Sequence, residues 1–195
     1  HPPKLVETTG NATLRGIGGE DGEIVIGAAS THADIAVDTL IITKLPFFAE
    51  GASLIGDLQV RNRGTIGGSL AHADPGADWP ALVLAADAAI EVQGANGQRR
   101  IKATDFFTGL FSTALQENEI ITAIRVPVPA LDTKTTYQKF VQPASRFAIV
   151  GCAVMRFADG KTNIAFTGVS DYAFRDNDAE KAISGKEVTD KSIAE

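Results

Sequence analysis

Short apolar runs alternate with polar, glycine-containing turns along most of this chain. Runs of this kind, rich in Val, Ile and Thr and bounded by Gly, Asn and Asp, are typical of paired strands. Two pairs predict β-hairpins, namely 13–17 with 23–28 and 88–93 with 98–102. A further strand is predicted at 119–126, where Pro127 ends it.

Helical spacing is confined to a few segments. Ser30 or Thr31 is expected to cap a short helix that ends near Asp38, and Pro46 is expected to begin one that ends near Leu54. A strand is predicted at 58–62, leading into a turn at 65–69. Asp78 is expected to cap the next helix, with Trp79 and Pro80 in its first turn.

Two prolines, Pro127 and Pro129, and a polar stretch at 132–136 predict a domain boundary. We therefore expect one domain at 1–132 and the start of a second at 133–195. The second has three strand candidates, at 137–141, 148–157 and 161–169, followed by a polar, helix-like segment at 177–195. Strand pairs with interspersed helices, rather than strict alternation, indicate an α+β fold.

Composition narrows the classes of partner. The chain has 195 residues, 44% of them hydrophobic and 22% charged, as in an ordinary globular protein. Its formal net charge of -6 opposes binding to nucleic acid or anionic lipid, and no apolar stretch is long enough for a membrane span. With Cys152 as the single cysteine, no intramolecular disulfide can form, and a reducing, cytoplasmic location is expected.

The numbers and spacing of cysteine and histidine residues argue against a metal centre on this chain. An iron–sulfur cluster needs several thiolate ligands, and one cysteine cannot supply them. The three histidines, His1, His32 and His72, have no metal-ligand spacing.

The segment Thr65-Ile66-Gly67-Gly68-Ser69 is the strongest candidate for ligand chemistry. Paired glycines let backbone N–H groups approach a bulky anion, and the flanking Thr65 and Ser69 hydroxyls can bind phosphate oxygens. The segment is therefore interpreted either as a phosphate cradle or as a plain turn.

Several blocks in order, at 24–31, 61–80, 105–109, 117–127 and 137–154, resemble the flavoprotein (medium) subunit of the molybdenum hydroxylases. That family includes carbon monoxide dehydrogenase and xanthine dehydrogenase. The resemblance implies an FAD-binding domain of the vanillyl-alcohol oxidase-like type, followed by a small α+β C-terminal domain with a three-stranded antiparallel sheet.

The resemblance also implies which residues contact FAD: Ile55, Gly56, Asp57, Thr65, Ile66, Gly67, Gly68, Ser69, His72, Asp78, Ile121 and Phe147. Four have an ordinary alternative. Gly56 suits the position after a helix end, Ile121 a strand core, His72 a surface loop and Asp78 an N-cap. No residue is assigned to catalysis, because no general base has an oriented partner.

Relatives more often have Asn at the position of Ser69, and both residues form hydrogen bonds, but two other departures from the family pattern matter more. Val141 stands where relatives often have a Lys near the flavin, so that a positive charge is expected to be absent. Phe147 stands where the carbon monoxide dehydrogenase branch often has Tyr; Phe can stack on a ring but cannot donate a hydrogen bond.

The resemblance implies an electron-transfer role in a hetero-oligomer. The molybdenum cofactor would lie on a large partner subunit, the [2Fe-2S] clusters on a small one, and FAD on this chain. The family's N-terminal subdomain, which carries a second glycine-rich phosphate loop, is not in this sequence. The C-terminal domain is also expected to be truncated. Two alternatives remain open: a structural docking fragment with an incomplete, empty FAD site, and a stand-alone flavin oxidoreductase.

Overall fold

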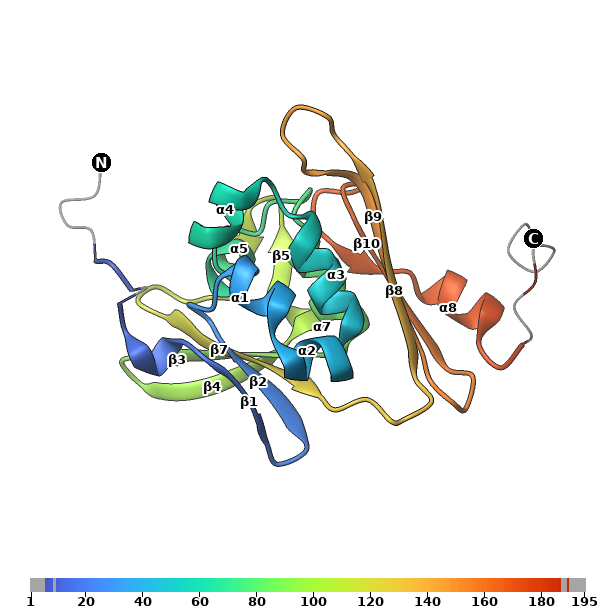
Figure 1. Cartoon of the computed structure of the whole chain (residues 1–195), viewed down its shortest axis with the longest axis horizontal. Helices are drawn as coiled ribbons and strands as arrows, with labels where there is room; N and C mark the ends of the chain where they lie inside the picture. Colours follow the sequence, from blue (N-terminus) through green and yellow to red (C-terminus); the bar gives the residue numbers. More distant parts are fainter. Residues whose placement is uncertain (1–5, 9, 187–188, 190–195) are drawn as a thin grey trace.

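The computed structural model describes residues 6–8, 10–186 and 189. Two antiparallel sheets stand on either side of a group of short helices, with α1, α2, α3 and α5 in the space between them (Figure 1). Helices and sheets are thus segregated into layers, which confirms the α+β class.

The first sheet has five strands in the order β1-β2-β7-β3-β4. Both predicted hairpins are present and lie in this sheet. The first pairs β1 (Ile17–Glu20) with β2 (Glu23–Gly27), and the second pairs β3 (Ala89–Gly94) with β4 (Gly97–Lys102). The central strand, β7 (Ile120–Pro127), joins them. The first hairpin is shorter than predicted, because a 3₁₀ turn, η1 (Ala12–Leu14), occupies its expected beginning.

Side chains that cap helix N-termini mark where several helices between the sheets begin. Thr31 forms a capping box with Asp34 at the start of α1 (His32–Val37), and Asp38 caps α2 (Thr39–Lys44), which was not predicted. The predicted helix from Pro46 is α3 (Pro46–Leu54). The remaining short elements here are α5 (Ile66–His72), α6 (Asp78–Ala85), α7 (Ala103–Phe106), β5 (Phe107–Gly109) and β6 (Ser112–Thr113).

The strand predicted at 58–62 is wrong, because this segment is helix α4 (Leu58–Arg63). The Asp57 carboxylate accepts a hydrogen bond from the Val60 N–H at 2.8 Å, which is the contact of an N-cap. Leu58 and Val60 are exposed, so their apolar character does not mark a buried strand face.

The second sheet has four strands in the order β11-β10-β9-β8. Three were predicted, and they are β8 (Lys134–Val141), β9 (Ala148–Arg156) and β10 (Thr162–Thr167). The two-residue β11 (Phe174–Arg175) adds an edge strand that is too short for a sequence pattern. The predicted C-terminal helix is α8 (Asn177–Ile183), and residues 187–188 and 190–195 of that prediction lie outside the described residues.

Helix α6 is buried along its whole length and packs against β9 and β10. The buried apolar residues form one cluster that includes members from both sheets, such as Ile24, Ile124, Tyr137 and Ala165. The boundary expected between 132 and 133 falls in the connection from β7 to β8. Its division of the chain into two domains stays a prediction.

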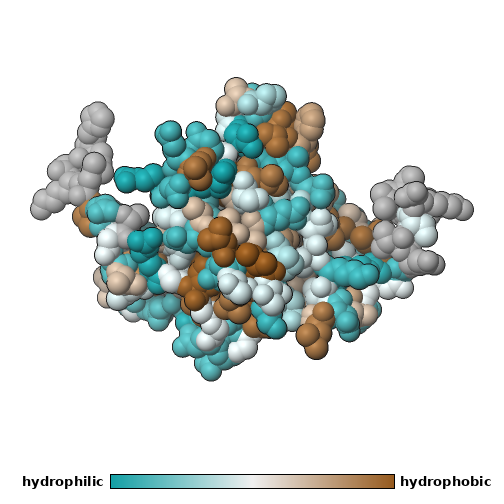
Figure 2. Space-filling model, in the orientation of Figure 1, coloured by the Kyte–Doolittle hydropathy of each residue, from teal (hydrophilic) through white to brown (hydrophobic). Residues whose placement is uncertain are grey.

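The surface is mostly mixed polar, with an apolar patch over α1 and α2 (Figure 2). Val37 and Ile42 are exposed there, at 74% and 51%. None of the helices in the described part of the chain is both long and apolar enough to cross a membrane.

Candidate functional site

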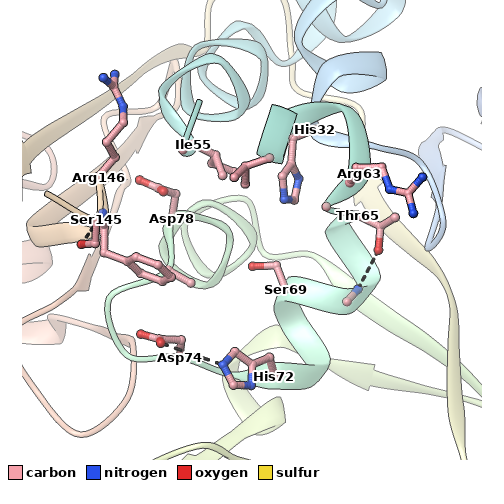
Figure 3. Close-up of a pocket in the computed structure, with 16 residues that line it drawn as sticks. His32, Ile55, Arg63, Thr65, Ser69, His72, Asp74, Asp78, Ser145 and Arg146 are labelled. Atoms are coloured by element: carbon pink, nitrogen blue, oxygen red, sulfur yellow. Dashed lines mark hydrogen bonds and ion pairs between the residues drawn. The ribbon is translucent and has the colours of Figure 1, made fainter. Parts of the chain in front are cut away.

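A pocket of about 440 Å³ opens where the ends of several helices meet the β8–β9 loop (Figure 3). This volume is within the range of about 300–1,000 Å³ that is usual for small-molecule sites. Its walls come from five stretches of chain: the start of α1, the loop after α3, the α4–α5 region, the loop before α6, and residues 145–147.

Pairing between two distant backbone segments builds one wall. The Ile66 N–H donates to Ser30 O at 3.2 Å, and the His32 N–H donates to Gly64 O at 3.0 Å. Residues 64–67 therefore run beside residues 28–32, with Thr31 opposite Thr65 and His32 next to Gly64. Two stretches that are far apart in the sequence thus face the same space.

Eight of the twelve residues predicted to contact a cofactor line this pocket: Ile55, Gly56, Thr65, Gly68, Ser69, His72, Asp78 and Phe147. Gly56 has a φ of 48°, and a Cβ there would lie 2.8 Å from Val60 Cβ, so this position is restricted to glycine on two grounds. The Arg61 guanidinium donates to the carbonyls of Ile55 and Gly56, which holds this turn against the pocket.

The other four lie elsewhere. Asp57 caps α4, as described above. Ile66 and Gly67 are buried, and a Cβ on Gly67 would lie 2.6 Å from the Cβ of Ala28, the residue after β2. Ile121 is buried in the five-stranded sheet, which is the core alternative for that position. Their direct contact with a ligand in this pocket is not supported by their positions.

The glycine pair forms the first turn of α5 rather than a free loop. Its N–H groups already have partners: Gly67 N–H donates to Ala28 O at 2.9 Å, and Gly68 N–H donates to the Thr65 hydroxyl at 3.1 Å. The Ser69 hydroxyl, in contrast, has no hydrogen-bond partner among the described residues and lines the pocket. Side-chain hydroxyls, more than backbone donors, are therefore available at this wall.

Asp78 does not cap α6, which corrects the N-cap alternative. Its neighbour Ala77 is the N-cap, without a side-chain hydrogen bond. The Tyr137 hydroxyl donates to Asp78 Oδ1 at 2.6 Å, and Lys139 Nζ donates to Asp78 Oδ2 at 2.9 Å. Burial raises the pKa of Asp78, and Lys139 and Tyr137 oppose that rise. Because Lys139 is buried beside the pocket, a positive charge lies here although Val141 supplies none.

His72 lies at the rim. Its side chain is 66% exposed, and Nε2 is 4.0 Å from Asp74 Oδ2, so the pair is a weak surface contact. Phe147, 44% exposed, lines the pocket from the opposite side and packs near Gly76.

Sequence reasoning missed half of the lining: His32, Val60, Arg63, Gly64, Asp74, Ala77, Ser145 and Arg146. Arg63 and Arg146 have no acidic partner among the described residues; they lie on opposite sides of the pocket rim, and their guanidinium groups point away from the pocket (Figure 3). The basic residues at 61 and 63, so close to the glycine pair, are a signal that could have identified Arg63. Arg146 had no comparable signal.

His32 and Asp78 are the two most buried polar residues of the wall, each at 4% exposure. The Trp79 indole N–H donates to His32 Nδ1 at 3.0 Å. Burial, with a smaller contribution from Arg61, lowers the pKa of His32 to about 4. The imidazole is therefore neutral at physiological pH.

The described residues contain no group of three or more His, Cys, Asp or Glu side chains arranged to hold a metal ion. What the pocket offers is an apolar side, hydroxyl and imidazole donors, a buried carboxylate and two rim cations. This donor set suits a large organic anion that has both a flat apolar part and polar groups.

Comparison with known proteins agrees with that chemistry. The chain is 39% identical to the carbon monoxide dehydrogenase medium chain of Hydrogenophaga pseudoflava, over 98% of this chain and 68% of the relative. It is 38% identical to the glyceraldehyde dehydrogenase medium chain of Sulfolobus acidocaldarius, over 87% of this chain and 62% of that relative. The chain thus spans about two thirds of the length of these relatives.

Solved structures give the same result. The fold matches carbon monoxide dehydrogenase from Hydrogenophaga pseudoflava with a TM-score of 0.88 and 43% identity, over 93% of this chain and 64% of that one. It matches CO dehydrogenase from Oligotropha carboxidovorans with a TM-score of 0.90 and 33% identity, over 94% of this chain and 65% of that one. Residues 1–129 match the family described as the FAD binding domain in molybdopterin dehydrogenase. The chain therefore belongs to this family of FAD-binding domains, with the medium chains of carbon monoxide dehydrogenase among its relatives.

Proposed function

We propose that this chain is the FAD-carrying, electron-transfer part of a molybdenum hydroxylase complex. In this proposal a large partner subunit holds the molybdenum cofactor and oxidises the substrate. A small partner subunit holds the [2Fe-2S] clusters. The electrons then reach an external acceptor through the FAD of this chain, in the cytoplasm. Family membership and the single cysteine support this assignment.

The observation that carries the proposal is the convergence of distant segments on one pocket. Ile55–Gly56, Thr65 with Ser69, Asp78 and Phe147 come from four different parts of the chain and line the same cavity. When bound, FAD supplies a centre that takes up and releases electrons. The pocket residues bind and orient it. None has the oriented partner expected of a general base, so we assign no proton transfer.

Each part of the donor set fits a part of FAD. Ile55 and Phe147 offer apolar surface for a flat ring, and Asp78 can accept hydrogen bonds from hydroxyl groups. The free Ser69 hydroxyl suits a phosphate oxygen, and Arg63 and Arg146 add positive charge on opposite sides of the rim. Asp57, Ile66, Gly67 and Ile121 would then support the wall from behind rather than touch the cofactor.

One observation favours the second candidate, a docking piece with an empty FAD site. The glycine N–H groups of α5 are already bonded within the chain, so they would have to exchange partners before they could bind phosphate. The two candidates differ in a single property, which is whether the protein retains flavin.

The absorption spectrum of the purified protein tests this directly. We expect flavin bands near their usual wavelengths and their loss in Gly68→Val, because the added side chain would face the pocket and crowd the Thr65 hydroxyl, 2.9 Å from the new Cβ. Gly19→Val is the matched control, since a Cβ on this strand glycine meets nothing within 4 Å.

A colourless wild-type protein that co-purifies with its partner subunits would favour the docking role. Full flavin content in Gly68→Val would show that the α5 wall does not bind the cofactor. Turnover of a substrate without any partner chain would instead support a stand-alone oxidoreductase.

A further inference from the structure

His32 has one ring nitrogen that the fold uses and one that it leaves free. Nδ1 accepts from the Trp79 indole at 3.0 Å, and an indole N–H can only donate. In a neutral imidazole the proton must therefore be on Nε2. Among the described residues, Nε2–H has no hydrogen-bond acceptor, and it is not among the polar atoms sealed away from solvent.

The free N–H is directed at the pocket. His32 is one of the lining residues, and its ring points into the space between Ile55 and Ser69 (Figure 3). Gly64 packs against the ring edge, where an added Cβ would lie 2.6 Å from Nε2. His32 is buried, at 4% exposure, and the Trp79 hydrogen bond and the Gly64 contact hold the ring in place.

We propose that His32 is a cofactor-binding residue that donates its Nε2–H to an acceptor atom of the bound FAD, and that Trp79 fixes it in the tautomer that can do so. This inference rests on the proposed FAD-binding function and adds a residue to it. The Nε2–H faces the pocket and is not sealed from solvent, so an acceptor atom of a bound ligand can take the place of water as its partner.

The neutrality of the ring has a consequence for the ligand. Its pKa of about 4 means that His32 donates a hydrogen bond without adding a positive charge. It therefore suits a neutral acceptor, such as a carbonyl or ring nitrogen of the flavin. The charged phosphates have other candidate partners, Arg63, Arg146 and Ser69.

Two substitutions separate the two nitrogens. In His32→Asn, the amide oxygen can replace Nδ1 as acceptor for Trp79, but the donor toward the pocket is lost. In His32→Gln, the longer amide can place an N–H near the position of Nε2, but the Trp79 contact is lost. We expect Asn to weaken FAD affinity about 10-fold, the size of one lost hydrogen bond, and Gln to weaken it less. We expect the melting temperatures to have the opposite order, with His32→Gln below His32→Asn, because only the Gln variant loses the Trp79 hydrogen bond.

The experiment uses the full-length protein and measures FAD affinity by fluorescence titration and stability by thermal unfolding. Histidine ¹⁵N resonances, recorded with and without FAD, provide an independent signal. We expect the His32 Nε2–H resonance to shift when FAD binds. ADP and riboflavin, titrated separately, distinguish a phosphate acceptor from a flavin-ring acceptor because riboflavin carries no phosphate, and we expect the His32→Asn defect to be found with riboflavin.

Equal FAD affinity in wild type and His32→Asn, or an Nε2 resonance that FAD does not move, would overturn the inference and leave the FAD-binding function intact. A defect found with ADP and absent with riboflavin would overturn the choice of a flavin-ring acceptor. If wild-type protein binds no FAD, the proposed function and this inference both fail. If His32 is purely structural, the FAD affinities of the two variants will have the same order as their melting temperatures, with His32→Asn binding more tightly than His32→Gln.

Discussion

At the scale of single residues, Asp78 shows that a side chain's role is decided by partners far away in the sequence. It precedes an apolar run, as a helix cap does, but its carboxylate contacts Tyr137 and Lys139. The Asp78 and Lys139 side chains are 5% and 1% exposed, so this is a buried ion pair. Removing one partner of such a pair leaves an uncompensated charge, which costs more than the pair itself contributes.

We predict that Asp78→Asn destabilises the protein by about 3–5 kcal/mol, because the buried Lys139 would lose its anionic partner. Urea unfolding measures the change. Asp57→Asn is the matched control: it makes the same chemical change at an exposed N-cap, where Asn and Asp are nearly equivalent. We expect less than about 0.5 kcal/mol there.

The double variant Asp78→Asn with Lys139→Gln checks the cause. If the loss arises from the unpaired lysine, the second substitution restores part of the stability, and the two effects are not additive. An Asp78→Asn protein as stable as the Asp57→Asn control would show that the ion pair is not important for folding.

At the scale of elements, the position of α5 depends on how closely it approaches the end of β2. Gly67 is where the two meet, and its N–H donates to Ala28 O at 2.9 Å. A Cβ on Gly67 would lie 2.7 Å from that same oxygen. The first glycine of the pair therefore serves packing, whereas Gly68 faces the pocket.

We predict that Gly67→Ala lowers stability by about 1–3 kcal/mol, the usual cost of forcing a methyl group into a packed contact. Gly18→Ala is the control, because a Cβ on that strand residue has no neighbour within 4 Å. Thermal unfolding of both variants gives the comparison. Equal melting temperatures would mean that α5 can move away from β2 at little cost.

The elements show where sequence reasoning succeeds and where it fails. The hairpins and α3 were predicted because turn glycines and Pro46 act locally. The segment 58–62 was predicted wrongly, because its apolar residues face solvent and the Asp57 cap was not considered. Thr65, Gly68 and Ser69 were found because they are adjacent in sequence.

The missed part of the pocket depends on contacts across the fold. His32 reaches the pocket through the pairing of 28–32 with 64–67, and Ser145 and Arg146 reach it from the loop between β8 and β9. No local pattern specifies either arrangement. Sequence reasoning therefore found the pocket wall whose residues are neighbours in the sequence, such as Thr65, Gly68 and Ser69. It missed most of the walls that are formed by distant segments.

At the scale of the whole molecule, the second sheet is tied to the loop that leads into α6. The Thr167 hydroxyl lies 2.6 Å from Pro75 O and 2.8 Å from Ala77 O, and the Ala148 N–H donates to Gly76 O at 3.0 Å. Helix α6 itself packs against β9 and β10. The predicted division into domains at 132 and 133 therefore separates segments that share one apolar core.

We predict that the two sheets unfold together in one cooperative transition. Trp79, the single tryptophan, lies in α6, so its fluorescence reports on the core between the sheets, and far-UV circular dichroism reports on the whole chain. The two urea curves should coincide.

Thr167→Val removes a hydroxyl from the second sheet. Both probes should then report a free energy of unfolding lower by about 1–3 kcal/mol, because the carbonyls of Pro75 and Ala77 lose the donor that Thr167 supplies. Thr43→Val, at an exposed helix position, should leave both nearly unchanged. Two separate transitions, or a Thr167→Val effect seen by circular dichroism and absent from Trp79 fluorescence, would mean that residues 133–195 fold as an independent domain.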